Sequence, residues 1–126
     1  MSWADDQKEF MQAGDQTTDK WNMVQCDRYI HHVVEEASEL LEAREAENGT
    51  KMVDALIDTI VVAIGALWSL GVNPDDAWAE VHAANMRKVI NGHVCRRADG
   101  QIGKPPGWYG PEAGLTELVV EAKQRK

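Results

Sequence analysis

The sequence has few of the residues that mark disulfide-bonded, zinc-binding or β-rich proteins. Its two cysteines, Cys26 and Cys95, lie far apart, and no CxxC or cysteine–histidine finger spacing occurs. We therefore expect two reduced thiols. The chain has only one phenylalanine and two tyrosines, and no alternating polar and apolar run is bounded by turn residues. Strand signals are consequently weak, which argues against an all-β fold.

Long apolar segments and a secretion signal are also missing. The longest unbroken apolar run is Ile60–Trp68, which is too short for a bilayer because a crossing helix needs about 20 apolar residues. The first residues, MSWADDQKEF, are acidic and lack an apolar signal core. We expect a soluble, cytoplasmic protein without a membrane partner.

An excess of basic residues is absent as well. The formal net charge is −8 and the isoelectric point is near 4.9, which argues against binding to a nucleic-acid polymer because such binding needs a basic face. A nucleotide ligand stays compatible, since bound metal ions can invert the local field. The 126 residues suit a single domain, 1–126. Its core would be small, so that self-association would help it.

Helical signals run through most of the chain. Apolar residues recur at spacings of four, three and four on one helical face at Ile30, Val34, Ala37 and Leu41. Asn73 followed by Pro74 is typical of a helix start.

These signals predict a succession of helices joined by short connections. In the turn ENGT we expect Gly49 to take the left-handed cap and Thr50 to begin a helix. The predicted helices are Ala4–Ala13, about 20–46 with a possible break near Asn22, 51–70, about 73–90 and a last helix in the segment 111–126, reaching about Ala122, with a glycine- and proline-rich tail over 91–110. The expected fold is all-α, a bundle of four to five helices.

An acidic cluster lies inside the second predicted helix, in the stretch VVEEASELLEA. Glu35, Glu36 and Glu39 fall within about 100° of one another on a helical wheel, opposite the apolar face. On this helix alone, a solvated charged face is the ordinary interpretation.

The third predicted helix changes that interpretation. It is apolar almost all round, so we expect it to be buried all round, yet it carries Asp54 and Asp58 on one face. An unpaired buried carboxylate costs several kcal/mol, which a salt bridge, a raised pKa or a metal would offset. Packing this pair against the three glutamates would gather up to five carboxylates. Such hard oxygen ligands favour Mg²⁺ or Mn²⁺.

A cationic counterpart follows the fourth predicted helix. Asn85 and Lys88 are three residues apart and share a face, and Lys104 lies in the tail. An amide and an ammonium suit a phosphate chain, whereas Arg87 is explained by the preference of cations for helix C-termini. A polyphosphate between these cations and the metal would be attacked by a metal-activated water. Glu35 or Glu36 would be the general base.

Together these motifs resemble a known family. EEASE, DALID, EVHAANMRK and DGQIGKPPGWYGP, spread over roughly 33–111, are similar to the all-α nucleoside triphosphate pyrophosphohydrolases of the MazG-like group. The likeness is greatest to the small single-domain forms carried by phages. The resemblance implies the following metal ligands: Glu36, Glu39, Asp54 and Asp58. This sequence departs from the family's Glu-x-x-Asp motif, because Ala55 stands three residues before Asp58 and the acid, Asp54, stands four before it. Small phage-type members also show this Asp-x-x-x-Asp form.

The resemblance also implies contacts to the nucleotide. The family's Asn-x-x-Lys matches Asn85 and Lys88, which there meet the phosphates, and the tail adds Lys104 and Tyr109 as phosphate or base contacts. The family motifs do not supply base recognition. Side chains just before the acidic cluster could supply it by stacking and by hydrogen bonding: Trp21, Asn22 and Gln25. Core packing of Trp21 and helix capping by Asn22 are the competing interpretations. Trp108 and Tyr109 would either clamp a ligand or pin the tail.

The implied reaction is hydrolysis of a (d)NTP between the α and β phosphates to (d)NMP and pyrophosphate. The implied assembly is a homodimer or a dimer of dimers, in which dimerisation completes the active bundle. Some phage members remove dATP and dGTP to bias the nucleotide pool, and others favour dUTP or dCTP. Two alternatives stay open: phosphoribosyl-ATP as the substrate, and a non-enzymatic helical assembly module.

Overall fold

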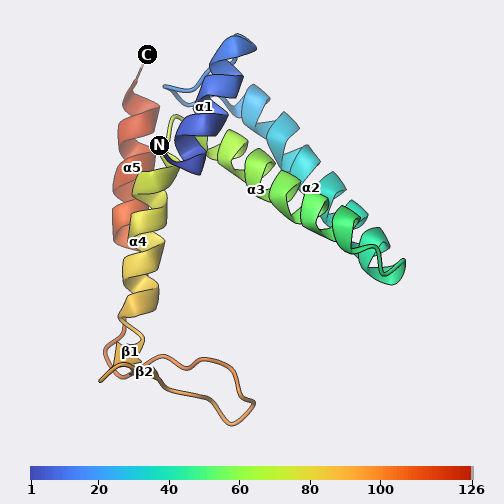
Figure 1. Ribbon diagram of the computed structural model, residues 1–126. Helices are drawn as coiled ribbons and strands as arrows, with labels where there is room; N and C mark the ends of the chain where they lie inside the picture. The colour runs from blue at the N-terminus through green and yellow to red at the C-terminus, as the bar shows by residue number, and fades with distance from the viewer. Residues whose placement is uncertain (126) are drawn as a thin grey trace.

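The computed structural model describes residues 1–125, and its regular secondary structure is helical apart from one short hairpin (Figure 1). This confirms the predicted all-α class. The elements in chain order are α1 (Trp3–Ala13), α2 (Met23–Glu45), α3 (Gly49–Ser69), α4 (Pro74–Met86), β1 (Val89–Ile90), β2 (His93–Val94) and α5 (Glu112–Gln124). The segment predicted over 111–126 contains α5, whereas Lys126 lies outside the described residues. That the chain forms one domain over 1–126 stays a prediction.

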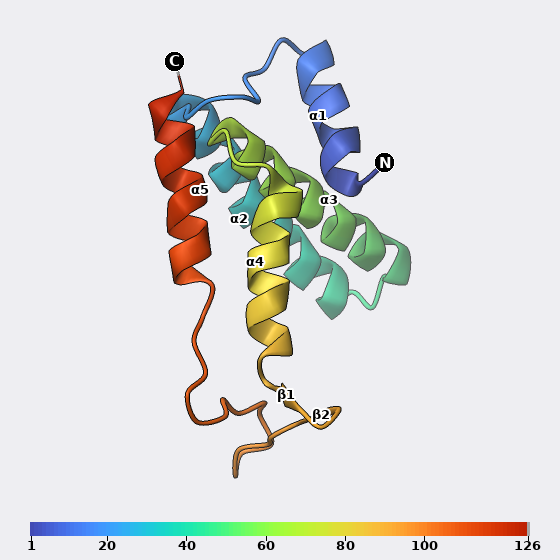
Figure 2. The same cartoon turned by 90° about the vertical axis from the view of Figure 1, so that its left-hand side faces the viewer.

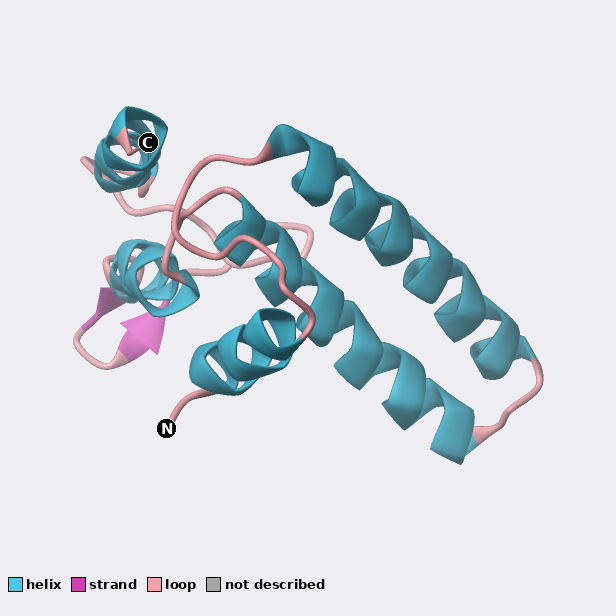
Figure 3. Cartoon of the chain, turned by 90° about the horizontal axis from the view of Figure 1, so that it is seen from above, coloured by secondary structure: helices cyan, strands magenta, loops and turns pink. Residues whose placement is uncertain are grey.

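The helices form two arms. α2 and α3 make a long antiparallel hairpin, whereas α4 and α5 run side by side in a second pair that diverges from it (Figures 1 and 2). α1 lies against α3 near the junction, as the view from above also shows (Figure 3). The core lies at this junction. One cluster joins Ala4 and Met11 to Trp68, and another joins Val72 and Ala77 to Ala122.

Asparagine side chains begin three of the helices. Asn22 accepts a hydrogen bond from the Gln25 backbone N–H, so that α2 begins at Met23 rather than near residue 20. Asn73 caps α4 with Pro74 in its first turn, as predicted. Both starts follow from the need to satisfy the unpaired N–H groups of a first helical turn.

The turn between α2 and α3 differs from the prediction. Glu47, with φ of 51°, takes the left-handed conformation, and Asn48 caps the next helix by accepting from the Lys51 N–H. Gly49 is therefore the first residue of α3, and the predictions of a cap at Gly49 and a start at Thr50 are wrong. Because Asn48 is the helix cap, Gly49 lies inside the first turn of α3 rather than before it.

The fourth predicted helix is shorter than expected. α4 ends at Met86 instead of near Ile90, because β1 and β2 form an antiparallel hairpin there. Asn91 and Gly92 join the two strands with positive φ angles of 52° and 79°. An Asn-Gly pair is a strong signal for a tight hairpin turn, and the sequence interpretation overlooked it.

The burial of α3 also corrects the prediction. We expected this helix to be buried all round, but Val53 is 62% exposed and Leu56 is 47% exposed. The apolar face of α2 is open as well, with Val34 60% and Leu41 67% exposed. The α2–α3 arm lies outside the junction that forms the core, so within one chain nothing covers these faces among residues 1–125.

By length and composition alone, α3 is the one helix in the described part of the chain that could cross a membrane. It carries Asp54 and Asp58, and a carboxylate at the centre of a bilayer costs about 2.5–3.5 kcal/mol on insertion scales. The same apolar composition occurs in core helices of soluble proteins, so it does not identify a membrane span.

Candidate active site

Acidic side chains of α2 and α3 meet where the two helices pack together. Glu36 is half-buried, and its Oε2 atom is buried without a hydrogen-bond partner. Burial raises the pKa of Glu36, and hydrogen bonding to and charge repulsion from Glu39 raise it further, followed by the charges of Asp58 and Asp54. The four predicted metal ligands therefore lie close enough together for the charges of Glu39, Asp58 and Asp54 to raise the pKa of Glu36.

The same acids do not form a closed metal cage. Among residues 1–125, no group of three or more His, Cys, Asp or Glu side chains stands in a metal-holding arrangement. Glu39 and Asp54 are exposed, whereas Asp58 is half-buried. The donor set is nonetheless all oxygen, which suits Mg²⁺ or Mn²⁺, and the partnerless Glu36 oxygen is an atom that a cation would satisfy. The chemistry of these donors therefore suits a divalent ion, although their arrangement within one chain is not that of a metal site, and their assignment as ligands stays a prediction.

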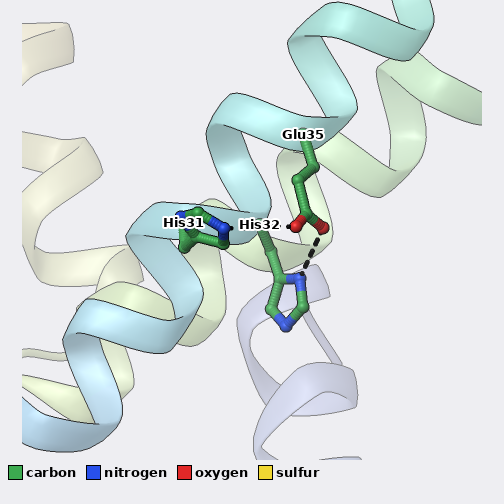
Figure 4. Close-up of polar contacts among 3 residues, drawn as sticks. All are labelled: His31, His32 and Glu35. Atoms are coloured by element: carbon green, nitrogen blue, oxygen red, sulfur yellow. Dashed lines mark hydrogen bonds and ion pairs between the residues drawn. The ribbon is translucent and has the colours of Figure 1, made fainter.

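Glu35 has a different environment from Glu36. Its two carboxylate oxygens contact His31 Nε2 at 3.3 Å and His32 Nδ1 at 3.2 Å (Figure 4). All three side chains are exposed. The two histidines meet one carboxylate because residues three and four apart are neighbours on a helix surface. Sequence reasoning left them without a role. Of the two candidate general bases, Glu36 is the one with a buried oxygen that has no hydrogen-bond partner.

A cavity of about 440 Å³ adjoins the acids at the far end of the α2–α3 hairpin. Glu39 and Asp54 both lie on its wall, and Lys51 is the only cation of its lining. The other lining residues are Glu42, Ala43, Ala46, Asn48 and Ala55. Small side chains thus leave a polar space directly beside the candidate metal ligands.

The residues predicted to meet the base have structural partners. The Gln25 side chain donates to the Thr17 carbonyl and to Ser69 Oγ, both at 2.7 Å, and accepts from the Thr17 N–H at 2.9 Å. Asn22, besides capping α2, donates to Thr17 Oγ1 at 3.2 Å. Trp21 packs on the cluster at the junction. Base recognition by these residues stays a prediction, and Gln25 would have to exchange its hydrogen bonds to take part.

The predicted phosphate-binding residues do come together, at the C-terminal end of α4. Lys88 Nζ lies 3.4 Å from Asn85 Oδ1. Lys88 and Lys104 both stand over the ring of Trp108, at 5.1 and 4.7 Å from its centroid. The tail thus folds back and gives Lys104 the same neighbour as Lys88, which sequence spacing alone did not show.

Arg87 holds the tail in this position. Its guanidinium donates to the carbonyls of Tyr109 and Gly110, both at 3.2 Å, and lies 3.9 Å from the centroid of the Tyr109 ring. Tyr109 is 66% exposed. Arg87 is therefore an anchor of the tail, and Tyr109 as a substrate contact stays a prediction.

The acids and the cations lie on different arms of the chain. Glu36 and its acidic neighbours belong to the α2–α3 hairpin, whereas Lys88 and Lys104 lie beyond the end of α4, and these arms diverge (Figures 1 and 2). One chain therefore presents the two predicted halves of the site separately.

An all-α fold with acidic side chains on two packed helices fits the class that the sequence resembles, the all-α nucleotide pyrophosphohydrolases. A family model described as "PRA-PH: Phosphoribosyl-ATP pyrophosphohydrolase" matches residues 8–85. The match covers more than half of the chain, so the protein belongs to this family, within the MazG-like superfamily of nucleotide pyrophosphohydrolases. Its members are hydrolases that act on phosphoanhydride bonds. A comparison with curated proteins finds no match.

Proposed function

We propose that the protein hydrolyses a (d)NTP between its α and β phosphates, with Mg²⁺ or Mn²⁺, to give (d)NMP and pyrophosphate. The observation that supports this most is the buried, partnerless Oε2 of Glu36 beside the charges of Glu39, Asp54 and Asp58. All four acids lie within the residues that match the family. The enzyme family counts against a non-enzymatic assembly module.

Each group of residues has a separate task in this proposal. Glu36, Glu39, Asp54 and Asp58 would hold the metal, which when bound supplies charge neutralisation at the phosphates and a water of lowered pKa. Asn85, Lys88 and Lys104 would bind the phosphate chain through charge-assisted hydrogen bonds. The general base is Glu35 or Glu36. Glu36 has the buried, partnerless oxygen, whereas Glu35 contacts His31 and His32.

The proposal includes a homodimer or a homotetramer. Acids and cations lie on diverging arms, so a second subunit that brings its own arm alongside would complete the site. The exposed apolar side chains of α2 and α3 support this, because Val34, Leu41 and Val53 are each at least 60% exposed and a second subunit would remove their apolar surface from water.

The substrate has a second candidate, phosphoribosyl-ATP, which the description of the matching family names. The matched residues end at Asn85, before the tail that carries Lys104. Because the tail is outside the match and resembles that of the small phage-type enzymes, we favour a (d)NTP. Within the (d)NTPs, the candidate substrates are dATP and dGTP, as in phage control of the nucleotide pool, and alternatively dUTP or dCTP.

We place the enzyme in the cytoplasm, or in the host cytoplasm if a phage encodes it. The net charge of −8 supports a nucleotide rather than a nucleic-acid polymer as its partner. The two aspartates in α3 argue against a membrane position.

A product-resolved substrate panel tests the proposal. The purified protein is incubated with each (d)NTP and with phosphoribosyl-ATP, with Mg²⁺ or Mn²⁺, and the products are separated by ion-exchange chromatography. We expect pyrophosphate together with a (d)NMP. Pyrophosphate with phosphoribosyl-AMP alone would assign the second substrate, and release of inorganic phosphate or no turnover at all would contradict the proposal.

A further inference from the structure

We propose that Trp108 is a positioning residue, which holds the ammonium groups of Lys88 and Lys104 as a pair for two adjacent phosphates. The ligand class is an inorganic or nucleotide-borne pyrophosphate group. The inference rests on the proposed function, because it assumes that this pyrophosphate group belongs to the substrate or is the product.

The position of the indole is fixed by α4. Trp108 is half-buried, and its Nε1–H donates to the carbonyl of Ala84 at 2.8 Å. Ala84 is itself buried, at 2% exposure, in the last turn of α4. The ring is therefore attached to a rigid helix although it belongs to the tail.

Two further sets of contacts position the segment around Trp108. Arg87 binds the carbonyls that follow the indole, at Tyr109 and Gly110. Before it, the Gly103 N–H donates to the Cys95 carbonyl at 2.7 Å, which closes a turn just ahead of Lys104. Lys104 thus approaches the ring from the tail, whereas Lys88 approaches it from the end of α4.

The ring brings together two charges that would otherwise repel each other. The face of an indole is negative, and ammonium groups within about 6 Å of its centroid are attracted to it. Lys88 and Lys104 satisfy this at 5.1 and 4.7 Å. The ion pairs among residues 1–125 involve other side chains: His31 and His32 with Glu35, and Arg97 with Asp99.

The charges of both lysines are therefore not neutralised by a carboxylate within the described chain. Lys88 Nζ is also near Asn85 Oδ1, at 3.4 Å, so that an amide and two ammonium groups flank one aromatic ring. In a chain of net charge −8, this is a local concentration of positive charge. It suits an anion with more than one charged oxygen centre better than a single carboxylate.

Binding of inorganic pyrophosphate tests the inference without any turnover. Calorimetric titrations in metal-free buffer compare the wild-type protein with Trp108→Ala and Trp108→Phe. We expect Trp108→Ala to weaken binding about tenfold, because two cation–π contacts are lost, and Trp108→Phe to stay within about threefold, because an aromatic face remains. Trp78→Ala is the matched control: Trp78 is 73% exposed on α4, and its loss should leave binding unchanged. Circular dichroism verifies that each variant is folded.

Three results would overturn the inference: no pyrophosphate binding by the wild-type protein, an unchanged affinity in Trp108→Ala, or an equal loss in Trp108→Ala and Trp108→Phe. The last would assign the effect to the hydrogen bond with Ala84, which phenylalanine cannot make.

Kinetics separate this inference from the proposed function. On the substrate found by the panel, we expect Trp108→Ala to raise KM about tenfold with kcat within about threefold, since the pair binds phosphates in the ground state and the transition state alike. A wild-type protein that hydrolyses its substrate while Trp108→Ala keeps the same KM contradicts the inference alone. A wild-type protein without hydrolysis contradicts the proposed function, and the pyrophosphate titration still decides the role of Trp108.

Discussion

At the scale of single residues, Glu36 is the acid with the most unusual surroundings. Its carboxylate is partly buried, one oxygen has no partner, and three further acids act on it. The sequence predicted that these acids would converge, because Asp54 and Asp58 share a helical face. It could not show which oxygen would be deprived of water, since that depends on how closely α2 and α3 pack.

Glu36→Gln should stabilise the metal-free protein at neutral pH. The pKa of Glu36 is raised in the folded state, so the wild-type carboxyl contributes stability that is full below the ordinary glutamate pKa of about 4.3. This stability is lost as pH rises through the folded-state value. In EDTA we therefore expect the melting temperature of wild type to fall, relative to Glu36→Gln, as pH rises from about 4 to 7. Thermal unfolding followed by circular dichroism measures this.

Saturating Mg²⁺ provides the control for the Glu36 prediction. A ligand that binds only the folded state stabilises it, so the metal should raise the melting temperature of wild type more than that of Glu36→Gln. Equal melting temperatures of wild type and Glu36→Gln in EDTA across the pH range would show that burial and the neighbouring acids do not raise the pKa of Glu36.

At the scale of elements, the helices could be predicted from spacing and caps, and the connections could not. The start at Asn73 was predicted from its cap and Pro74, whereas the predicted start near residue 20 missed the cap at Asn22. The α2–α3 turn and the hairpin at Asn91 depend on which residue takes positive φ, and several neighbours compete for that position. The α2–α3 contact itself requires a glycine, at Gly65.

Gly65→Ala should destabilise the fold by about 1–3 kcal/mol. A methyl group at this position of α3 would overlap the ring of Tyr29 on α2, whose hydroxyl group donates to the Gln16 side chain. Urea unfolding measures the loss. Gly49→Ala is the matched control: nothing lies within 4 Å of an added methyl group there, and alanine favours a helix by about 1 kcal/mol. A neutral Gly65→Ala would mean that α2 and α3 are not in such close contact.

At the scale of the whole molecule, the main departure from the sequence interpretation is the open α2–α3 arm. Apolar periodicity places Val34 and Leu41 on one apolar face, but a sequence does not say whether its own chain or a second one covers that face. The structure shows that the described chain does not. It likewise places Lys88 and Glu36 on different arms, although the sequence predicts that they belong to one site.

Leu41→Glu should convert an oligomer to monomers. Leu41 is 67% exposed on the apolar face of α2, and a charge buried in an interface without a partner costs several kcal/mol. Sedimentation equilibrium should give a dimer or tetramer for wild type and a monomer for the variant. Phe10→Glu, on α1, is the control, because Phe10 is also exposed, at 71%, but belongs to neither arm. A monomeric wild-type protein, or an oligomer unchanged by Leu41→Glu, would contradict this account.

The most direct test of the central claim is Mg²⁺ binding measured by isothermal titration calorimetry, on the wild-type protein and on Glu39→Gln and Asp58→Asn, with Glu45→Gln as control. The account predicts that wild type and Glu45→Gln bind Mg²⁺ alike. It also predicts that each substitution in the acidic cluster weakens binding at least about tenfold, since a charged oxygen ligand is lost. Binding of equal strength in all four proteins, or none in wild type, would contradict the claim that acids of α2 and α3 share a divalent cation.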